Sequence, residues 1–399
     1  MGGVLVKVIT TSGAVSGDGT VFRGVPYAAP PVGAGRFAAP APPVPWSGVR
    51  DATAPGPSAP APDRRWFGRA DLGPLMGVDR ISGDDHLTAT VWTPSTAGRA
   101  PVMVFVHGGG FVSGTGSAAV YDGSAFARDG IVLVVLNYRL GAPGWLSLPD
   151  APDNRGLLDV LAALEWVRDN IAAFGGDPDR VTLFGQSAGA MVVSALVVTP
   201  AAHGLFHRAI SQSGGLVEMP PETAEAASTA LADALGIDRT AEAFGDVPDD
   251  DLVDAVTRLK PAGRAGVSPF GVVRFDHHPA PGVDLLVGNN SEESKLYQDP
   301  SRSAAIDAMF QAGSRSLVEA HGGALTYEFD WRDGPYGACH TVELPFVFDT
   351  TGLPELRGPH GLLGPDVPPG LAAEVHGAWV RFATTGDPGW AGHHRFIGP

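Results

Sequence analysis

Cysteine is almost absent from this chain. Among 399 residues there is one, Cys339, so no disulfide can form within the chain. Free thiols persist in reducing compartments, which favours a cytoplasmic protein. The adjacent pairs His277–His278 and His393–His394 have no supporting cysteine or carboxylate cluster. Neighbouring residues rarely supply two ligands to one ion, so we expect no metal and no other cofactor.

Positive charge is also scarce. Lysine and arginine number 27 against 43 aspartate and glutamate residues, which gives a formal net charge of −16. Lysine occurs only at Lys7, Lys260 and Lys295. Phosphate backbones and anionic lipid headgroups would repel so acidic a chain. We therefore expect neither a nucleic-acid partner nor a membrane partner.

Long apolar runs are missing as well. No uninterrupted apolar stretch approaches the roughly 18 residues that indicate a membrane-spanning helix. Residues 1–17 lack a basic segment followed by an apolar segment and a cleavage site, so no secretory signal is predicted. Val6 occupies the position where an N-myristoylation signal has serine or threonine. The expectation is a soluble, cytoplasmic protein, and its oligomeric state stays open.

The most informative segment that is present contains a serine between two glycines. The pentapeptide G-Q-S-A-G at residues 185–189 follows the apolar run 181–184 and precedes the helix-forming stretch 190–198. In that strand–turn–helix context the turn holds the central serine, Ser187, on a tight elbow with its hydroxyl clear of the sheet. Glycine is needed on both sides because the turn leaves no room for a Cβ atom. The segment predicts a serine hydrolase with Ser187 as nucleophile.

Apolar runs that suit buried strands alternate with segments of helical period. Strands are expected at residues 87–92, 102–106, 131–138, 181–184, 208–213, 283–288 and 325–329. Helices are expected at 154–174, 190–198 and 370–384, and over most of 221–259. Residues 4–10 and 14–17 read as an antiparallel hairpin. The alternation predicts one α/β domain over 1–399, with a mostly parallel central sheet flanked by helices. Segments 214–282 and 294–324 are expected to be helical excursions around the active site.

A glycine run follows the strand expected at 102–106. Residues 107–111 read H-G-G-G-F. Glycines directly after a strand leave backbone N–H groups free to converge on one point, as a tetrahedral oxyanion requires. A phosphate-binding loop would need a lysine and a hydroxyl residue on the following helix, and neither is present. We interpret the run as an oxyanion hole.

The serine also needs a base and an acid that orients the base, and spacing alone leaves both open. In α/β-hydrolases the chain order is serine, acid, histidine. The acid is expected just after the strand 283–288, in the segment 289–293. His340 lies in a loop after the next strand. The histidines that compete with it are His321, His360 and His376.

Several segments resemble the type-B carboxylesterases, the family of bacterial para-nitrobenzyl esterases, mammalian carboxylesterases and cholinesterases. Residues 174–189 fit the serine signature of that family at every constrained position. Further matching segments span nearly the whole chain, at 22–28, 36–37, 107–111, 137–141, 154–159, 379–383 and 385–388. The resemblance implies an α/β-hydrolase fold and the hydrolysis of carboxylic esters.

The resemblance also assigns roles to individual residues. Ser187 corresponds to the nucleophile and His340 to the base. Glu293 corresponds to the acid, because residues 288–293 fit the family pattern G-x-N-x-x-E, while Glu292 faces solvent or a neighbouring loop. The oxyanion donors would be three backbone N–H groups, those of Gly109, Gly110 and Ala188.

Three features depart from the family pattern. His86 stands where the family has a cysteine that is often disulfide-bonded, so that bridge is absent. Thr341 replaces the glycine that usually follows the catalytic histidine, a tolerable change unless that position needs a positive φ. Only 46 residues lie between Glu293 and His340, fewer than usual in the segment that helps to wall the active site. The site is then more open, or closed by something else such as a partner subunit.

The sequence indicates the substrate only in outline. Aromatic residues proposed to bind it are Phe111, Trp66, Phe67 and Phe346, with Phe270 and Trp331 as further candidates. They suggest a small to medium hydrophobic ester, cleaved through an acyl-enzyme. An acyltransferase or cyclase that uses the same triad in a biosynthetic pathway is the alternative. A catalytically inactive relative is disfavoured because the serine and the oxyanion glycines are intact.

Overall fold

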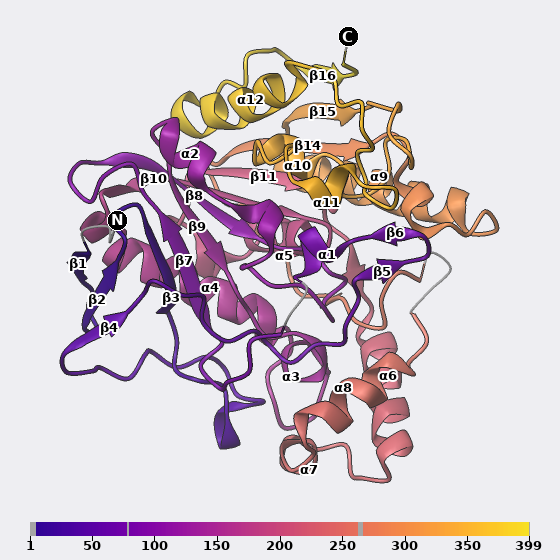
Figure 1. Ribbon diagram of the computed structural model, residues 1–399. Coiled ribbons are helices and arrows are strands. Elements are labelled where there is room, and N and C mark those ends of the chain that lie inside the picture. The colour runs from indigo at the N-terminus through magenta and orange to yellow at the C-terminus, as the bar shows by residue number, and fades with distance from the viewer. Residues whose placement is uncertain (1–4, 78–79, 262–265, 399) are drawn as a thin grey trace.

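A nine-stranded sheet forms the centre of the protein (Figure 1), whose computed structural model describes residues 5–77, 80–261 and 266–398. From one edge to the other its strands are β16 (His393–Phe396), β15 (Leu325–Phe329), β14 (Asp284–Asn290), β11 (Arg208–Gln212), β10 (Gly176–Gln186), β8 (Ala100–Val106), β9 (Val132–Leu136), β7 (Thr88–Trp92) and β3 (Val21–Pro26). Neighbours from β16 to β9 are parallel, and β7 pairs antiparallel with both β9 and β3. The predicted mostly parallel sheet of the α/β-hydrolase fold is confirmed.

Alternating side chains of the strands supply two hydrophobic cores, one on each face of the sheet. In β8, Val102, Val104 and Val106 belong to one core, whereas Met103 and Phe105 belong to the other. Successive side chains of a strand point to opposite faces, so a strand covered on both sides is apolar throughout. This is why the buried strands appear in the sequence as continuous apolar runs.

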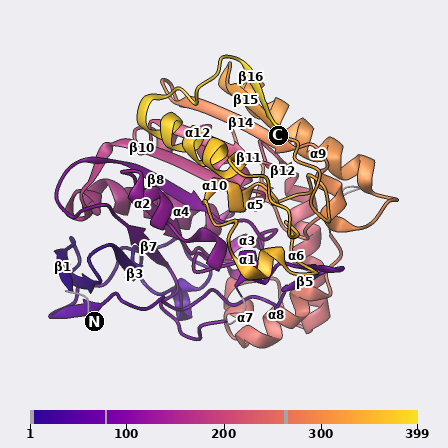
Figure 2. The ribbon, with the colours of Figure 1, turned by 45° about the horizontal axis from the view of Figure 1, so that its top comes forward.

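Helices cover both faces of the sheet (Figure 2). One core contains side chains of α4 (Arg155–Asn170), α5 (Ala188–Val197) and α9 (Ser303–His321). The other contains side chains of α2 (Ser124–Arg128), α10 (Leu344–Val347) and α12 (Leu371–Thr385). The segment predicted to be mostly helical forms α6 (Pro221–Leu235), α7 (Ala241–Gly245) and α8 (Asp249–Thr257), which gather at the opposite end of the molecule from α12 (Figure 1).

Smaller elements complete the part of the chain that the structure describes. The predicted hairpin is present as β1 (Val6–Ile9) and β2 (Ala14–Gly17), which pair antiparallel. The remaining elements that concern the site are β5 (Trp66–Phe67), β6 (Ala70–Asp71), α1 (Gly73–Met76), β12 (Glu218–Met219), β13 (Val272–Val273) and the short 3₁₀ helix η5 (Glu293–Tyr297). Among the described helices, none combines the length and the apolar character needed to cross a bilayer.

The two edge strands of the sheet, β3 and β16, were missed by the sequence analysis. β3 contains Gly24 and ends at Pro26, and its pairing with β7 shifts register between Phe22 and Val25. β16 reads H-H-R-F and has only one fully buried side chain, that of Phe396. Edge strands tolerate glycine, proline and charge because one side pairs with no neighbour. Neither segment therefore shows the apolar pattern of a buried strand.

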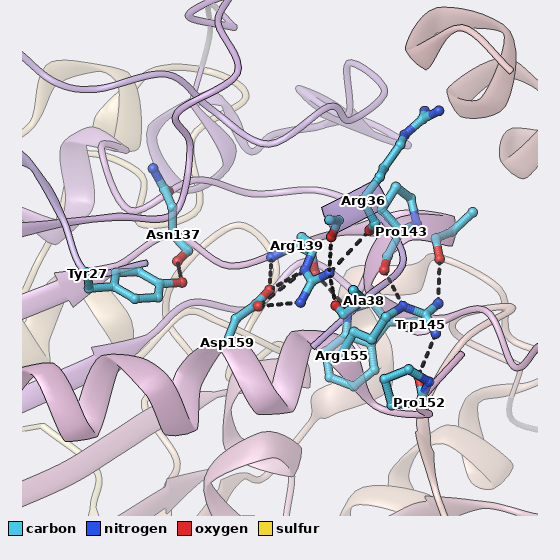
Figure 3. A network of polar contacts seen from close by, with 12 residues as sticks. Tyr27, Arg36, Ala38, Asn137, Arg139, Pro143, Trp145, Pro152, Arg155 and Asp159 are labelled. Carbon is cyan, nitrogen blue, oxygen red and sulfur yellow. Dashed lines mark hydrogen bonds and ion pairs between the residues drawn. The ribbon is translucent and has the colours of Figure 1, made fainter. Parts of the chain in front are cut away.

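A buried ion pair connects the loop after β9 to α4 (Figure 3). Arg139 donates to both carboxylate oxygens of Asp159, with its shortest contact at 2.7 Å from Nη2 to Oδ1, and both side chains are almost completely buried. Nη1 of Arg139 donates to the carbonyl of Ala38 at 2.7 Å. Two residues further along, the Gly141 N–H donates to the carbonyl of Phe111 at 2.7 Å. The ion pair thus fixes the loop after β9, and this loop in turn contacts the glycine turn at Phe111.

We expect Asp159→Asn to destabilise the protein by about 3–5 kcal/mol, because it leaves the Arg139 charge buried without a counter-charge. Urea unfolding would measure the change. The matched control is Asp169→Asn on the same helix. Its partner, Arg168, lies 2.7 Å away in an exposed pair, where the expected change is below about 1 kcal/mol. Equal effects of the two variants would contradict the prediction.

Candidate active site

Ser187 lies on the tight turn between β10 and α5 that the glycine pattern predicted. Its backbone has φ 56° and ψ −124°, a conformation that non-glycine residues rarely adopt. Its N–H donates to the carbonyl of Gln212 at 2.9 Å, which ties the turn to β11. A Cβ atom on Gly189 would overlap the carbonyl oxygen of Val106, and one on Gly185 would lie 2.7 Å from the backbone of Gly189. The two glycines are therefore required by the close approach of β8.

Glu293 and His340 meet in a buried hydrogen bond. Oε2 of Glu293 lies 2.6 Å from Nδ1 of His340, and both residues are at most 3% exposed. The other carboxylate oxygen accepts the N–H of Asn290 at 2.7 Å. Because Nδ1 faces a carboxylate, it carries the proton, and Nε2 is left as an acceptor.

The three competing histidines lie elsewhere. His376 contacts the carbonyl of Val347 at 2.8 Å and Asp129 at 3.1 Å, on the face covered by α12. His321 contacts the carbonyl of Gly323, and the ring of His360 packs against Trp66. Of the four candidate histidines, His340 is the one whose ring contacts Glu293.

The residue before the nucleophile contacts the base. Gln186, the residue before Ser187, places its Nε2 atom 3.4 Å from Nε2 of His340. No bond joins Ser187 Oγ to His340 among these described side chains. Such contacts are often long in free enzymes and tighten when substrate binds. The Gln186 amide therefore contacts Nε2 of His340, the atom that would accept the proton of Ser187.

The short segment between Glu293 and His340 itself covers the base. Phe310 of α9 stacks on the His340 ring, with centroids 4.5 Å apart and planes at 26°. Tyr297 of η5 packs on the same ring at 5.9 Å. The imidazole is 3% exposed. The His340 ring is therefore covered by side chains of this chain, Phe310 and Tyr297.

The glycine turn after β8 leaves its N–H groups available. Gly109 and Gly110 have φ angles of 115° and 63°, which favour glycine. The carbonyl of Gly109 accepts the N–H groups of Val112 and Ser113, at 3.3 and 3.1 Å. No described residue accepts a hydrogen bond from the N–H of Gly109, Gly110 or Ala188. The three predicted donors are thus free to bind an oxyanion.

His107 is a structural support of this turn. Its ring stacks on Tyr138 with centroids 4.6 Å apart, and Nδ1 lies 2.7 Å from the carbonyl of Gly108. Burial lowers the pKa of His107 to about 4. The Tyr138 hydroxyl donates to the carbonyl of His107 at 2.8 Å. His107 therefore stays neutral and donates from Nδ1, which fixes the start of the turn.

A second buried carboxylate, Glu343, was missed by the sequence analysis. Its two oxygens accept hydrogen bonds from Asn290 Nδ2 at 2.6 Å and Gln212 Nε2 at 3.4 Å. Burial, followed by the negative charge of Glu293, raises the pKa of Glu343 from 4.5 to about 7. A carboxylate directly before a short apolar segment, residues 344–348, is the only sequence signal of this residue. Glu343 lies beside the Glu293–His340 pair.

The raised pKa of Glu343 has a consequence for stability. The folded state holds this proton more tightly than the unfolded state, so the free energy of unfolding falls as pH rises from about 4.5 to 7. Glu343→Gln removes the titration. We expect the wild type to lose on the order of 2 kcal/mol relative to this variant between pH 5 and 7.5.

Urea unfolding at a series of pH values measures this difference. Glu319→Gln, which changes an exposed carboxylate on α9, is the matched control and should follow the wild-type pH dependence. Parallel pH profiles for the wild type and Glu343→Gln would show that Glu343 titrates normally.

Thr341, which replaces the family glycine, does adopt a positive φ. Its φ is 76°, and its buried hydroxyl has no hydrogen-bond partner among the described residues. A β-branched residue in this region costs on the order of 1–3 kcal/mol. Ser213, which directly follows β11, also has a positive φ, 51°, and no described partner for its Oγ. Backbone strain is thus concentrated around the site.

Glu292 and Cys339, which are chain neighbours of Glu293 and His340, are held in structural contacts or buried. Glu292 forms an ion pair with Lys295 at 2.8 Å and accepts the N–H of Ala338 at 3.1 Å. Cys339 is completely buried, and burial raises the pKa of its thiol far above the ordinary value. A protonated, inaccessible thiol is a poor nucleophile.

A cavity of about 350 Å³ opens at Ser187. Its wall includes Gly110 and Ala188 together with apolar side chains from several elements. The apolar side chains are those of Phe111, Met191, Val217, Met219, Pro220, Val267, Phe270 and Met309. Of the aromatic residues suggested by the sequence, Phe111 and Phe270 therefore lie at the cavity.

Three residues proposed to bind substrate do not line this cavity. Phe346 is completely buried and packs against Phe329 and Trp331, because it belongs to the core under α12. Trp66 is 54% exposed. Phe67 packs on Tyr297, with centroids 5.5 Å apart. The placement of Phe346 in the pocket was wrong; sequence cannot tell a core aromatic from a pocket aromatic when both follow a catalytic loop.

Histidine pairs form no metal site in the described part of the chain, where no group of three or more His, Cys, Asp or Glu residues could hold an ion. His277 instead contacts Glu218 at 2.8 Å, and His394 contacts Glu374 at 3.2 Å.

The chain is similar to known esterases along nearly all of its length. The model of the carboxylesterase family matches residues 7–296. The para-nitrobenzyl esterase of Bacillus subtilis is 35% identical over 94% of this chain and 88% of its own length. The phenmedipham hydrolase of Pseudarthrobacter oxydans is 36% identical over 95% and 90%. A solved para-nitrobenzyl esterase structure superposes with a TM-score of 0.85 at 32% identity, covering 97% of this chain and 93% of that one. The chain belongs to the carboxylesterase family and is a carboxylic ester hydrolase with the α/β-hydrolase fold.

Proposed function

We propose that Ser187, His340 and Glu293 hydrolyse a hydrophobic ester of small to medium size through an acyl-enzyme. The observation that carries this proposal is the 2.6 Å contact between Glu293 and His340, beside a serine held on a strained turn. His340 takes the proton of Ser187 as its oxygen attacks the ester carbonyl, while Glu293 stabilises the imidazolium. His340 then protonates the leaving alcohol. Water repeats the sequence on the acyl-enzyme and releases the acid.

The negative charge of the tetrahedral intermediate would fall on three backbone donors. The N–H groups of Gly109, Gly110 and Ala188 have no competing acceptor in the described structure. Ala188 begins α5, so the positive end of the helix dipole adds to the stabilisation. Removal of one such donor typically costs about 10² to 10³ in kcat.

The cavity at Ser187 is the site that we assign to the acyl chain. His340 must reach the leaving oxygen to protonate it, and His340 does not line this cavity. The alcohol therefore leaves on the His340 side, and the acyl chain extends the other way. The flexible thioethers of Met191, Met219 and Met309 suit a chain without a fixed shape.

A series of p-nitrophenyl esters from acetate to decanoate tests the assignment. Each methylene that the cavity buries is worth about 0.8 kcal/mol, so kcat/KM should rise roughly three- to fourfold per methylene until the cavity is full. Phe270→Ala should move the optimum to longer chains. Phe275→Ala, which changes a partly buried ring outside the cavity wall, is the matched control and should keep the wild-type optimum.

The same assay separates hydrolysis from acyl transfer, the alternative left by the sequence. Adding alcohols or amines as acceptors and quantifying the acyl products measures the partition of the acyl-enzyme. If free acid is the main product at every acceptor concentration, the result supports hydrolysis. A flat chain-length profile unaltered by Phe270→Ala would refute the acyl assignment of the cavity.

A further inference from the structure

A second cavity, of about 220 Å³, lies at the other end of the glycine turn, and its wall includes an arginine that has no partner among the described residues. Gly110 and Phe111 face the acyl cavity, whereas Ser113, Gly114 and Thr115 line this second one. Its opposite wall includes Arg64, which comes two residues before β5. The two cavities therefore flank the turn that would hold the oxyanion.

A chain of contacts leads from the wall of the second cavity through the glycine turn to His340. A Cβ atom on Gly114 would lie 2.7 Å from the carbonyl of Gly108, and one on Gly108 would lie 2.8 Å from Oε1 of Gln186. Gln186 in turn contacts the His340 ring at 3.4 Å. These contacts connect the cavity wall to the base.

A second path of contacts starts from the β5–β6 hairpin, which lies beside α1 (Figure 1). Phe67 of β5 packs on Tyr297, and Tyr297 packs on His340, with ring centroids 5.5 and 5.9 Å apart. Arg64 lies two residues before the start of that strand. Both paths lead from the cavity wall toward the base, which is the side that we assign to the leaving alcohol.

No described residue compensates the charge of Arg64. The side chain is partly buried, and no described residue offers it a hydrogen bond or an ion pair. Asp63, on the same wall, is exposed and accepts the N–H of Arg65 at 2.9 Å instead. Arg65 is paired with Asp71 at 2.8 Å.

Besides the carboxylate of Asp63, the cavity wall contains groups that can bind an anion. Arg80 contributes a second guanidinium, which is paired with Asp250 at 3.0 Å on the outer side. Ser58 accepts the N–H of Ile81 at 3.5 Å, and its own proton is available for donation. A planar guanidinium and a hydroxyl donor match the oxygens of a carboxylate.

We propose that the preferred esters carry an anionic group, such as a carboxylate, on their alcohol portion, and that Arg64 binds this group. The inference rests on the proposed function, since it names the leaving-group side of the same reaction. It also explains why a partly buried arginine with no counter-charge among the described residues lines a cavity beside the glycine turn. Burial, which lowers the pKa of Arg64, shows that its charge is poorly solvated in the free protein.

The test uses pairs of butyrate esters that differ only in charge. Butyrates of ω-hydroxycarboxylic acids with two, three or four methylenes are compared with the corresponding carboxamides, by titration of the acid released. A charged hydrogen bond is worth roughly 1.5–3 kcal/mol, so wild-type kcat/KM for the carboxylate should exceed that for the amide about tenfold at the best spacer. The ratio should fall as ionic strength rises.

Three variants locate the effect. Arg64→Gln should bring the carboxylate-to-amide ratio close to one while leaving kcat/KM for the amides within about twofold. Arg64→Lys should give an intermediate ratio, because it keeps the charge and loses the bidentate geometry. Arg69→Gln removes an exposed arginine from the same hairpin and should keep the wild-type ratio.

A ratio at or below one for every spacer, or a ratio that Arg64→Gln leaves unchanged, would overturn the inference while esterase activity itself persists. Hydrolysis of neither the amides nor the carboxylates would instead overturn the proposed function and this inference with it.

Discussion

Replacement of Ser187 by alanine is expected to lower kcat by about 10⁵- to 10⁶-fold and to abolish covalent labelling by a fluorophosphonate. The nucleophile is then gone, whereas the N–H donors of the glycine turn and the base remain. The substrate should still bind, because the cavity wall is otherwise intact. Ester turnover, together with intact-mass detection of the phosphonylated protein, measures both effects.

Ser213→Ala is the matched control for this variant. Ser213 also has a positive φ and a buried hydroxyl near the site, yet it does not begin a helix behind a strand. Labelling should be retained at Ser187 in this variant. Labelling that survives in Ser187→Ala would mean that another residue is the nucleophile.

The second large effect is expected for Glu293→Gln, with a loss of about 10³- to 10⁴-fold in kcat. The amide keeps the shape of the side chain but cannot stabilise an imidazolium. It can also donate to Nδ1 of His340, whose contact with Oε2 now measures 2.6 Å, and so favour the wrong tautomer. The serine should react slowly with a fluorophosphonate but remain the labelled residue.

Glu292→Gln is the matched control one residue away. Glu292 is paired with Lys295 and bonded to the Ala338 N–H, so its loss should change kcat by less than about tenfold. Equal losses in the two variants would show that Glu293 does not act on His340 directly. The contrast also checks the choice between two adjacent carboxylates that spacing in the sequence left open.

Local chemistry let the sequence determine the elbow and the glycine turn. The glycines around Ser187 and after β8 stand out in the chain itself, although the clash that requires Gly189 comes from Val106 on β8, and the flanking strands are apolar on both faces. These signals survive in a single sequence, because no distant residue is needed to read them. The edge strands β3 and β16 show no such apolar pattern, since one edge of each strand has no neighbouring strand.

Tertiary structure decided everything that depends on residues far apart in the chain. Only the fold brings His340 rather than His376 to Glu293, and only packing shows that Phe346 lies in the core while Phe270 lines a cavity. The same holds for Arg64, whose lack of a partner is a fact about its neighbours in space. A sequence specifies which chemistry is possible at each position, whereas burial and contact, which arise from long-range packing, select the chemistry that is used.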